Sequence, residues 1–150
     1  MKRRPHGFTL IELLVAITIV GIMTAVAMPR LKNGMAGESV RNARRTVVSH
    51  LSKARAAAAS RGCRSVFHVV AGSDPQVWVT ACPLNGAGVD TIGAVSHLEE
   101  SFGVAVSLAG DSLTFMPTGL GMGTGWIVMK FGKASYSDTL AISPLGQARW

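Results

Sequence analysis

The sequence has few of the residues from which catalytic and metal sites are usually built. Among its 150 residues there are only two cysteines and four histidines. Cys63 and Cys82 lie too far apart in sequence for a Cys-x-x-Cys pair and do not fit a zinc-binding pattern. The histidines also lack metal-ligand spacing; they are His6, His50, His68 and His97. These shortages predict a chain that is not an enzyme and holds neither a metal nor a cofactor.

Acidic residues are scarce too, and their distribution is uneven. The chain has 8 Asp and Glu against 15 Lys and Arg, a formal net charge of +7. Between Arg30 and Arg64 there are nine basic residues and a single acidic one, Glu38, whereas from Ser65 onward six acidic residues outnumber three basic ones. A basic stretch of this kind is typical of a solvated face beside anionic lipid or acidic neighbouring subunits. Nucleic-acid binding along the stretch is the alternative.

One long apolar run contrasts with this background. It extends from Phe8 to Met28, follows basic residues at positions 2–4 and is closed by Pro29. About 21 residues at a helical rise of about 1.5 Å cover about 30 Å, enough to cross the hydrocarbon core of a bilayer. Its single carboxylate, Glu12, costs about 3 kcal/mol at mid-membrane. We therefore expect Glu12 to have a function and a charged partner.

The segment Gly7-Phe8-Thr9-Leu10-Ile11-Glu12 resembles the class III signal of type IV pilins and type II secretion pseudopilins. In that family a prepilin peptidase cuts after the glycine and methylates the new amino terminus. The resemblance implies cleavage between Gly7 and Phe8, N-methylation of Phe8, and a role for Glu12 in neutralising the terminal amine of a neighbouring subunit during filament assembly. The alternatives are an uncleaved anchor or an ordinary secretory signal cut after Ala25-Val26-Ala27, although secretory signals have apolar regions of only about 7–15 residues.

The basic leader predicts the topology. By the positive-inside rule it keeps the N-terminus cytoplasmic, so we expect a single-pass inner-membrane protein with a periplasmic C-terminal domain, later moved into a pilus or pseudopilus. The implied partners are other pilins or pseudopilins, the prepilin peptidase and inner-membrane lipid. Under this topology an oxidising periplasm favours a disulfide between Cys63 and Cys82. Two buried free thiols on neighbouring strands are the alternative.

Periodicity beyond Pro29 predicts a second, amphipathic stretch of helix that ends at a Gly62 cap. Five apolar residues recur on one helical face: Val40, Val47, Leu51, Ala54 and Ala58. Gly34 and Gly37 weaken the joint between the two helical parts, so we expect a bend or frayed turn there.

After Gly62 the pattern changes to that of strands. Strands are predicted at 65–71, 76–81, 104–108, 113–116, 126–131 and 136–143. Tight hairpins are predicted at 72–75 and 109–112, and the glycine-rich segment 119–125 is interpreted as a mobile strand connection. The predicted class is α+β, a long N-terminal helix packed on an antiparallel β-sheet domain. Its expected divisions are a leader (1–7), a transmembrane or filament-core helix (8–29), an amphipathic helix (30–62) and a periplasmic β-rich domain (63–150).

Later motifs resemble the GspH/FimT-like branch of this superfamily. They are Cys63 at the opening of a strand, Trp78 in the next strand, and the segments Leu113–Gly119 and Leu140–Gly146. The resemblance implies a FimT/FimU-like minor pilin with a structural, assembly-priming role in a type IV pilus. A GspH-like minor pseudopilin of a type II secretion system is the alternative.

Some FimT-like minor pilins are DNA receptors in natural transformation and use a C-terminal Gly-Arg-x-Arg motif. The corresponding residues here are Gly146-Gln147-Ala148-Arg149-Trp150, so Gln147 replaces the first arginine. Arg149 could contact a phosphate, Trp150 could stack on a base, and Lys130 and Lys133 could add charge. One or two phosphate contacts bind weakly, and an exposed final strand is the alternative to a DNA site.

Overall fold

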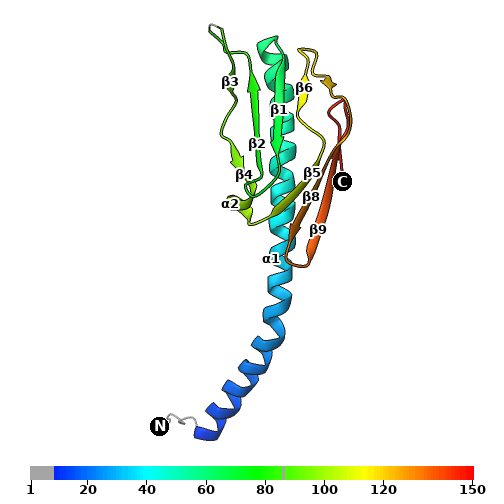
Figure 1. Cartoon of the computed structure of the whole chain (residues 1–150). Coiled ribbons are helices and arrows are strands. Elements are labelled where there is room, and N and C mark those ends of the chain that lie inside the picture. Colours follow the sequence, from blue (N-terminus) through cyan, green and yellow to red (C-terminus); the bar gives the residue numbers. More distant parts are fainter. Residues whose placement is uncertain (1–8, 86) are drawn as a thin grey trace. The chain divides into compact units, whose positions relative to one another are not determined.

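A computed structural model describes residues 9–85 and 87–150. The chain divides into two compact units, residues 1–35 and 36–150. Helix α1 (Leu10–Arg61) begins in the first unit and ends in the second. The remaining elements belong to the second unit (Figure 1): β1 (Ser65–Val70), β2 (Gln76–Ala81), β3 (Asp90–Thr91), β4 (Ser96–His97), α2 (Leu98–Phe102), β5 (Ala105–Ala109), β6 (Leu113–Phe115), β7 (Gly121–Met122), β8 (Ile127–Lys133), β9 (Tyr136–Ile142) and β10 (Ala148–Arg149).

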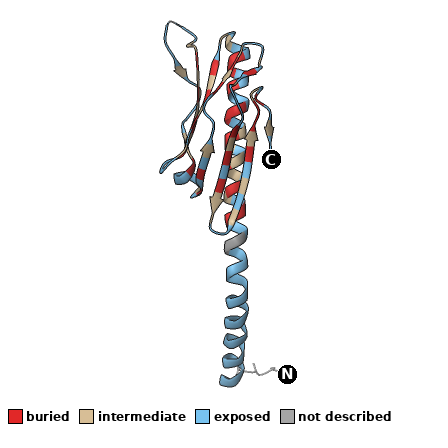
Figure 2. Ribbon diagram, turned by 45° about the vertical axis from the view of Figure 1, so that its right-hand side comes forward, coloured by how far each residue is buried: buried red, intermediate tan, exposed pale blue. Residues whose placement is uncertain are grey.

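In the first unit, α1 is apolar and uncovered. Its side chains are exposed from Leu10 to Leu31 (Figure 2), and its most apolar window has a mean hydropathy of 2.4. By length and composition this helix is able to cross a membrane. Thr9 caps its start, because the Oγ1 of Thr9 accepts a hydrogen bond of 3.3 Å from the backbone N–H of Glu12.

The helix is continuous where a frayed turn was expected. Pro29 lies inside α1, and the helical assignment runs on through Gly34 and Gly37. Within the second unit, Gly37 is buried and the ring of Tyr136 packs against it. This packing outweighs the low helix propensity of glycine. The predicted end is confirmed, since α1 stops at Arg61, one residue before Gly62.

The second unit contains two antiparallel sheets. The first has the order β3-β2-β1-β6-β7, with β4 also pairing with β2, and the second has the order β10-β9-β8-β5. The α+β class is therefore confirmed, and the six predicted strands appear as β1, β2, β5, β6, β8 and β9. The short elements β3, β4, α2, β7 and β10 were not predicted.

One face of α1 and the inner faces of both sheets form the core. The predicted apolar face of the helix is buried, and Ala43 joins it. Phe67 of β1, Phe115 of β6 and Phe131 of β8 are fully buried against this face (Figure 2). Each such side chain contributes about 1.5–3 kcal/mol relative to leaving it in water. Burial on this face thus holds the helix and both sheets together as one packed unit.

The predicted hairpin at 109–112 is wrong. Strand β5 pairs with β8, whereas β6 pairs with β1 and β7, so this segment crosses from one sheet to the other. A Cβ atom added to Gly110 would lie 2.9 Å from the Cα of Ile127. The glycine is needed because the crossing chain passes close to β8, rather than because the chain makes a tight turn.

Part of the glycine-rich segment 119–125 is bonded to the turn at 143–146. The N–H of Gly121 donates to the carbonyl of Leu145 (3.2 Å), and that of Gly123 donates to the carbonyl of Pro144 (3.1 Å). A Cβ on Gly121 would lie 2.7 Å from the carbonyl carbon of Leu145. The outer edge of β7 is therefore bonded to the turn that follows β9.

Candidate assembly and binding sites

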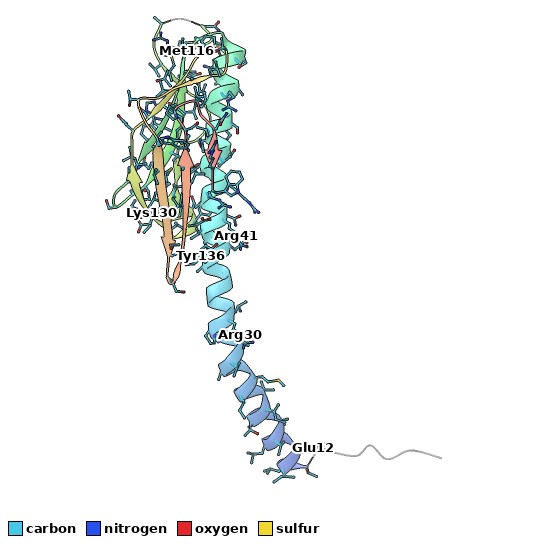
Figure 3. All side chains as sticks on the ribbon, turned by 90° about the vertical axis from the view of Figure 1, so that its right-hand side faces the viewer. Glu12, Arg30, Arg41, Met116, Lys130 and Tyr136 are labelled. Carbon is cyan, nitrogen blue, oxygen red and sulfur yellow. A yellow bond between two sulfur atoms is a disulfide. The ribbon has the colours of Figure 1, made fainter. Side chains whose placement is uncertain are left out.

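Glu12 is the carboxylate of the apolar segment, and its side chain is open to a partner. It lies in the first turn of α1, exposed among apolar neighbours (Figure 3). Within residues 9–85 and 87–150 Glu12 forms no ion pair. The predicted cleavage residues Gly7 and Phe8 lie outside the described residues.

Cys63 and Cys82 form the predicted disulfide, with a Cα–Cα distance of 6.3 Å. The bond joins the chain just beyond α1 to the residue that follows β2. Beside it, Nη1 of Arg61 donates to the carbonyl of Cys82 (2.6 Å) and to Oδ2 of Asp90 (2.8 Å). The disulfide and the arginine together fasten the loop between β2 and β3 to the end of the helix.

Lys133, one of the four predicted DNA contacts, is occupied inside the protein. Its half-buried ammonium donates to Oγ of Ser39 (3.0 Å) on α1 and to the carbonyl of Phe102. Lys133 therefore helps to hold the β8–β9 hairpin on α1.

Of the other three predicted DNA contacts, two lie on one face of the second sheet and the third contacts α1. The guanidinium of Arg149 lies over the ring of Trp126, 5.9 Å from its centroid, whereas Trp150 lies 5.3 Å from the guanidinium of Arg44 on α1. Lys130 is exposed on β8 (Figure 3). The strand register places Lys130 and Arg149 on the outer face of the second sheet. Trp150 contacts α1 instead, so the arginine and the tryptophan do not face a single ligand.

Gly146, which opens the tail motif, has a structural role. It has a φ of 84°, and a Cβ there would lie 2.5 Å from Cε1 of Phe115. Its carbonyl accepts a hydrogen bond of 2.9 Å from Nη2 of Arg55, which ties the turn to α1. Glycine is therefore required at this position by its positive φ and by packing.

Two histidines, His50 and His68, are held by contacts inside the protein. The ring of His68 stacks on Trp78 with 4.8 Å between centroids, and its Nε2 is hydrogen-bonded to Oγ1 of Thr80 (2.8 Å). Burial lowers the pKa of His68, an effect that the nearby Asp111 partly offsets. Burial, followed by the charge of Lys53, lowers the pKa of His50. No group of three His, Cys, Asp or Glu in the described part of the chain could hold a metal.

Comparisons with known proteins agree with these features. The family model for the prokaryotic N-terminal methylation motif matches residues 2–28. The chain is 27% identical over 152 residues to the fimbrial protein EcpC of Eikenella corrodens, covering 91% of this chain and 90% of that protein.

Two crystal structures of the type IV minor pilin FimU from Pseudomonas aeruginosa are similar in fold. Their TM-scores are 0.55 and 0.51, with sequence identities of 15% and 17%. The matches cover 75% and 73% of this chain and 87% and 90% of those chains. These likenesses concern the fold alone. The motif and the relative support a pilin of the type IV superfamily, and the two solved structures show a similar fold.

Proposed function

We propose that this chain is a minor pilin that is incorporated in a type IV pilus and has a structural, assembly-priming role there rather than an enzymatic one. The observation that carries the proposal is the exposed carboxylate of Glu12 in the first turn of an uncovered apolar helix. Such a helix is stable only when a bilayer or other apolar helices cover it. In either setting Glu12 also needs a positive partner.

Processing would supply that partner. Cleavage between Gly7 and Phe8 removes the basic residues of the leader and frees an amine, which is then methylated on Phe8. In a water-poor filament core, this ammonium pairs with Glu12 of an adjacent subunit. A subunit in the wrong register would leave both charges unpaired, so the pair selects the register of docking. The leader (1–7) is then lost, and residues 8–29 form the core helix.

The remaining segments have a different task in this proposal. The amphipathic part of the helix (30–62) and the β-rich domain (63–150) lie in the periplasm before assembly and present contact surfaces to other pilins afterwards. The prepilin peptidase and inner-membrane lipid are the partners before assembly. A GspH-like pseudopilin would use the same cleavage and docking, so it remains the alternative. A DNA receptor is less well supported, since Lys133 is occupied and Arg149 and Trp150 contact different groups.

Co-expression with a prepilin peptidase, followed by mass measurement of the intact chain, tests the proposal. We expect a mature protein that begins at Phe8 and carries one methyl group on its amine. A Gly7→Val variant should keep the leader and serves as the control for specific cleavage. A native chain that begins at any other residue would overturn the proposed processing.

A further inference from the structure

The second unit contains a polar groove that takes no part in the proposed docking of the apolar helix. This groove, of about 470 Å³, follows one face of α1. Its lining is entirely polar: Asn42, Arg45, Thr46, Ser49, His50 and Lys53 of α1, and Ser96 of β4. The α1 residues recur every three or four positions, so the groove extends over about three helical turns.

His50 lines this groove, and its hydrogen-bonding capacity is only partly used. Its side chain is only 2% exposed, and its Nε2 is hydrogen-bonded to Oγ of Ser96 at 2.9 Å. Its Nδ1 is buried without a hydrogen-bond partner among the described residues. Buried ring nitrogens usually have a partner. The groove therefore contains polar groups that the described part of the chain does not pair.

The groove is also positively charged. No ion pair or hydrogen bond of Lys53 occurs among residues 9–85 and 87–150, and its charge acts on His50. Arg45 has a loose contact of 3.8 Å with Glu38, with side chains 71% and 54% exposed, and its Nη1 donates a long hydrogen bond of 3.4 Å to Oδ1 of Asn42. Exposed pairs of this kind contribute little and exchange readily. No carboxylate lines the groove, so two cations and several hydroxyl groups face whatever enters it.

We propose that the groove docks an acidic segment of a neighbouring subunit, whose carboxylates pair with Lys53 and Arg45. This inference rests on the proposed function, because it takes its partner from the filament. A groove three turns long suits several carboxylates on a protein surface better than one small anion. The chain itself shows the complementary chemistry, since Glu99 and Glu100 are adjacent, exposed carboxylates of α2.

A photo-crosslinking amino acid at Ser49 in the full-length chain, expressed in cells that assemble the filament, tests which molecule enters the groove. Ser52 is the matched control, since it is an exposed serine of the same helix that does not line the groove. We expect an adduct at Ser49, absent at Ser52, with a pilin peptide that contains at least two acidic residues. No adduct, or an adduct with a neutral or basic peptide, a nucleic acid or a lipid, would overturn the inference.

Charge reversal provides the second measurement. Lys53→Glu should lower the amount of the chain in sheared filaments by about tenfold or more, because it places like charges together at the contact. Arg64→Glu, an exposed change outside the groove, should leave incorporation unchanged. Changing the cross-linked acidic residue of the partner to lysine should restore incorporation. Normal incorporation of Lys53→Glu contradicts the groove inference alone, whereas absence of the unmodified chain from filaments contradicts the proposed function.

Discussion

Arg44 of α1 and Asp138 of β9 form a half-buried ion pair, with side chains 20% and 24% exposed. This contact joins the β8–β9 hairpin to the helix, next to the Lys133–Ser39 hydrogen bond. Part of the basic stretch of α1 is therefore internal structure. Lys53, in contrast, faces solvent without a partner in the described residues. The net charge of the stretch does not distinguish cations that are paired inside the protein, such as Arg44, from cations that face solvent, such as Lys53.

Arg44→Ala should destabilise the second unit by about 1–3 kcal/mol, because it leaves the half-buried Asp138 carboxylate without its partner. The free energy of unfolding can be measured by urea titration of the detergent-solubilised chain. Arg41→Ala is the control, since Arg41 has only an exposed contact of 3.8 Å with Glu38 and should change stability by less than about 0.5 kcal/mol. Equal effects of the two substitutions would show that the Arg44–Asp138 pair contributes nothing beyond a surface contact.

Replacing Cys63 and Cys82 by serine should lower the free energy of unfolding by about 3 kcal/mol in the chain-entropy model, since the disulfide closes a loop of about 20 residues. The loss should be seen as a lower unfolding midpoint, and the unmodified chain treated with dithiothreitol should match the double variant. The same reductant should leave the midpoint of the double variant unchanged. A reductant-insensitive midpoint for the unmodified chain would contradict this prediction.

Stability should fall as pH drops below about 6.5, because burial lowers the pKa values of His50 and His68 from the ordinary value of 6.5. Near that pH the unfolded chain binds protons that the folded chain does not, so protonation favours unfolding. The stabilisation from the two neutral histidines is complete above their pKa in the unfolded chain. It is lost as the pH falls toward their lower pKa values in the folded chain. Urea midpoints measured between pH 7.5 and pH 5 should show this trend, and His50→Gln should flatten it. A midpoint that rises on acidification in this range would contradict the direction.

Gly146→Ala should be strongly destabilising, by about 2 kcal/mol or more, because the new methyl group would clash with Phe115 and the residue has a positive φ. Gly125→Ala is the matched control, since a Cβ at Gly125 meets nothing within 4 Å and its φ is not positive. We expect a large difference in thermal unfolding midpoint between the two variants. Similar midpoints would mean that the turn at 143–146 adapts more easily than its packing indicates.

The elements with a long periodic pattern could be predicted from the sequence. The apolar face of α1 and the six longer strands have enough residues for their periodicity to be visible. Strands β3, β4, β7 and β10 contain two residues each, which is too short for any alternation. Gly110 was misinterpreted because a turn signal and a close crossing of two chain segments both require glycine.

The sites were only partly predictable for a related reason. Cys63 and Cys82 are the only cysteines, so their pairing followed from the compartment that the topology implies. The groove could not be found in this way, because it needs Ser96, from a segment with no predicted element, to lie beside His50 of α1. Likewise, Lys133 was expected to be available to a ligand, although its ammonium is hydrogen-bonded to Ser39 of α1.

Glu12→Ala should separate processing from assembly. The substitution removes the carboxylate and leaves the proposed cleavage site at Gly7–Phe8 intact, so the peptidase should still produce a mature, methylated chain of the correct mass. The variant should remain in the inner membrane and be lost from sheared filaments, because the neighbour's ammonium would have no counter-charge in the water-poor core. Glu38→Ala, which removes an exposed carboxylate of the second unit, is the control and should assemble normally. Filaments that contain Glu12→Ala at the normal level would show that register is selected by the apolar contacts alone.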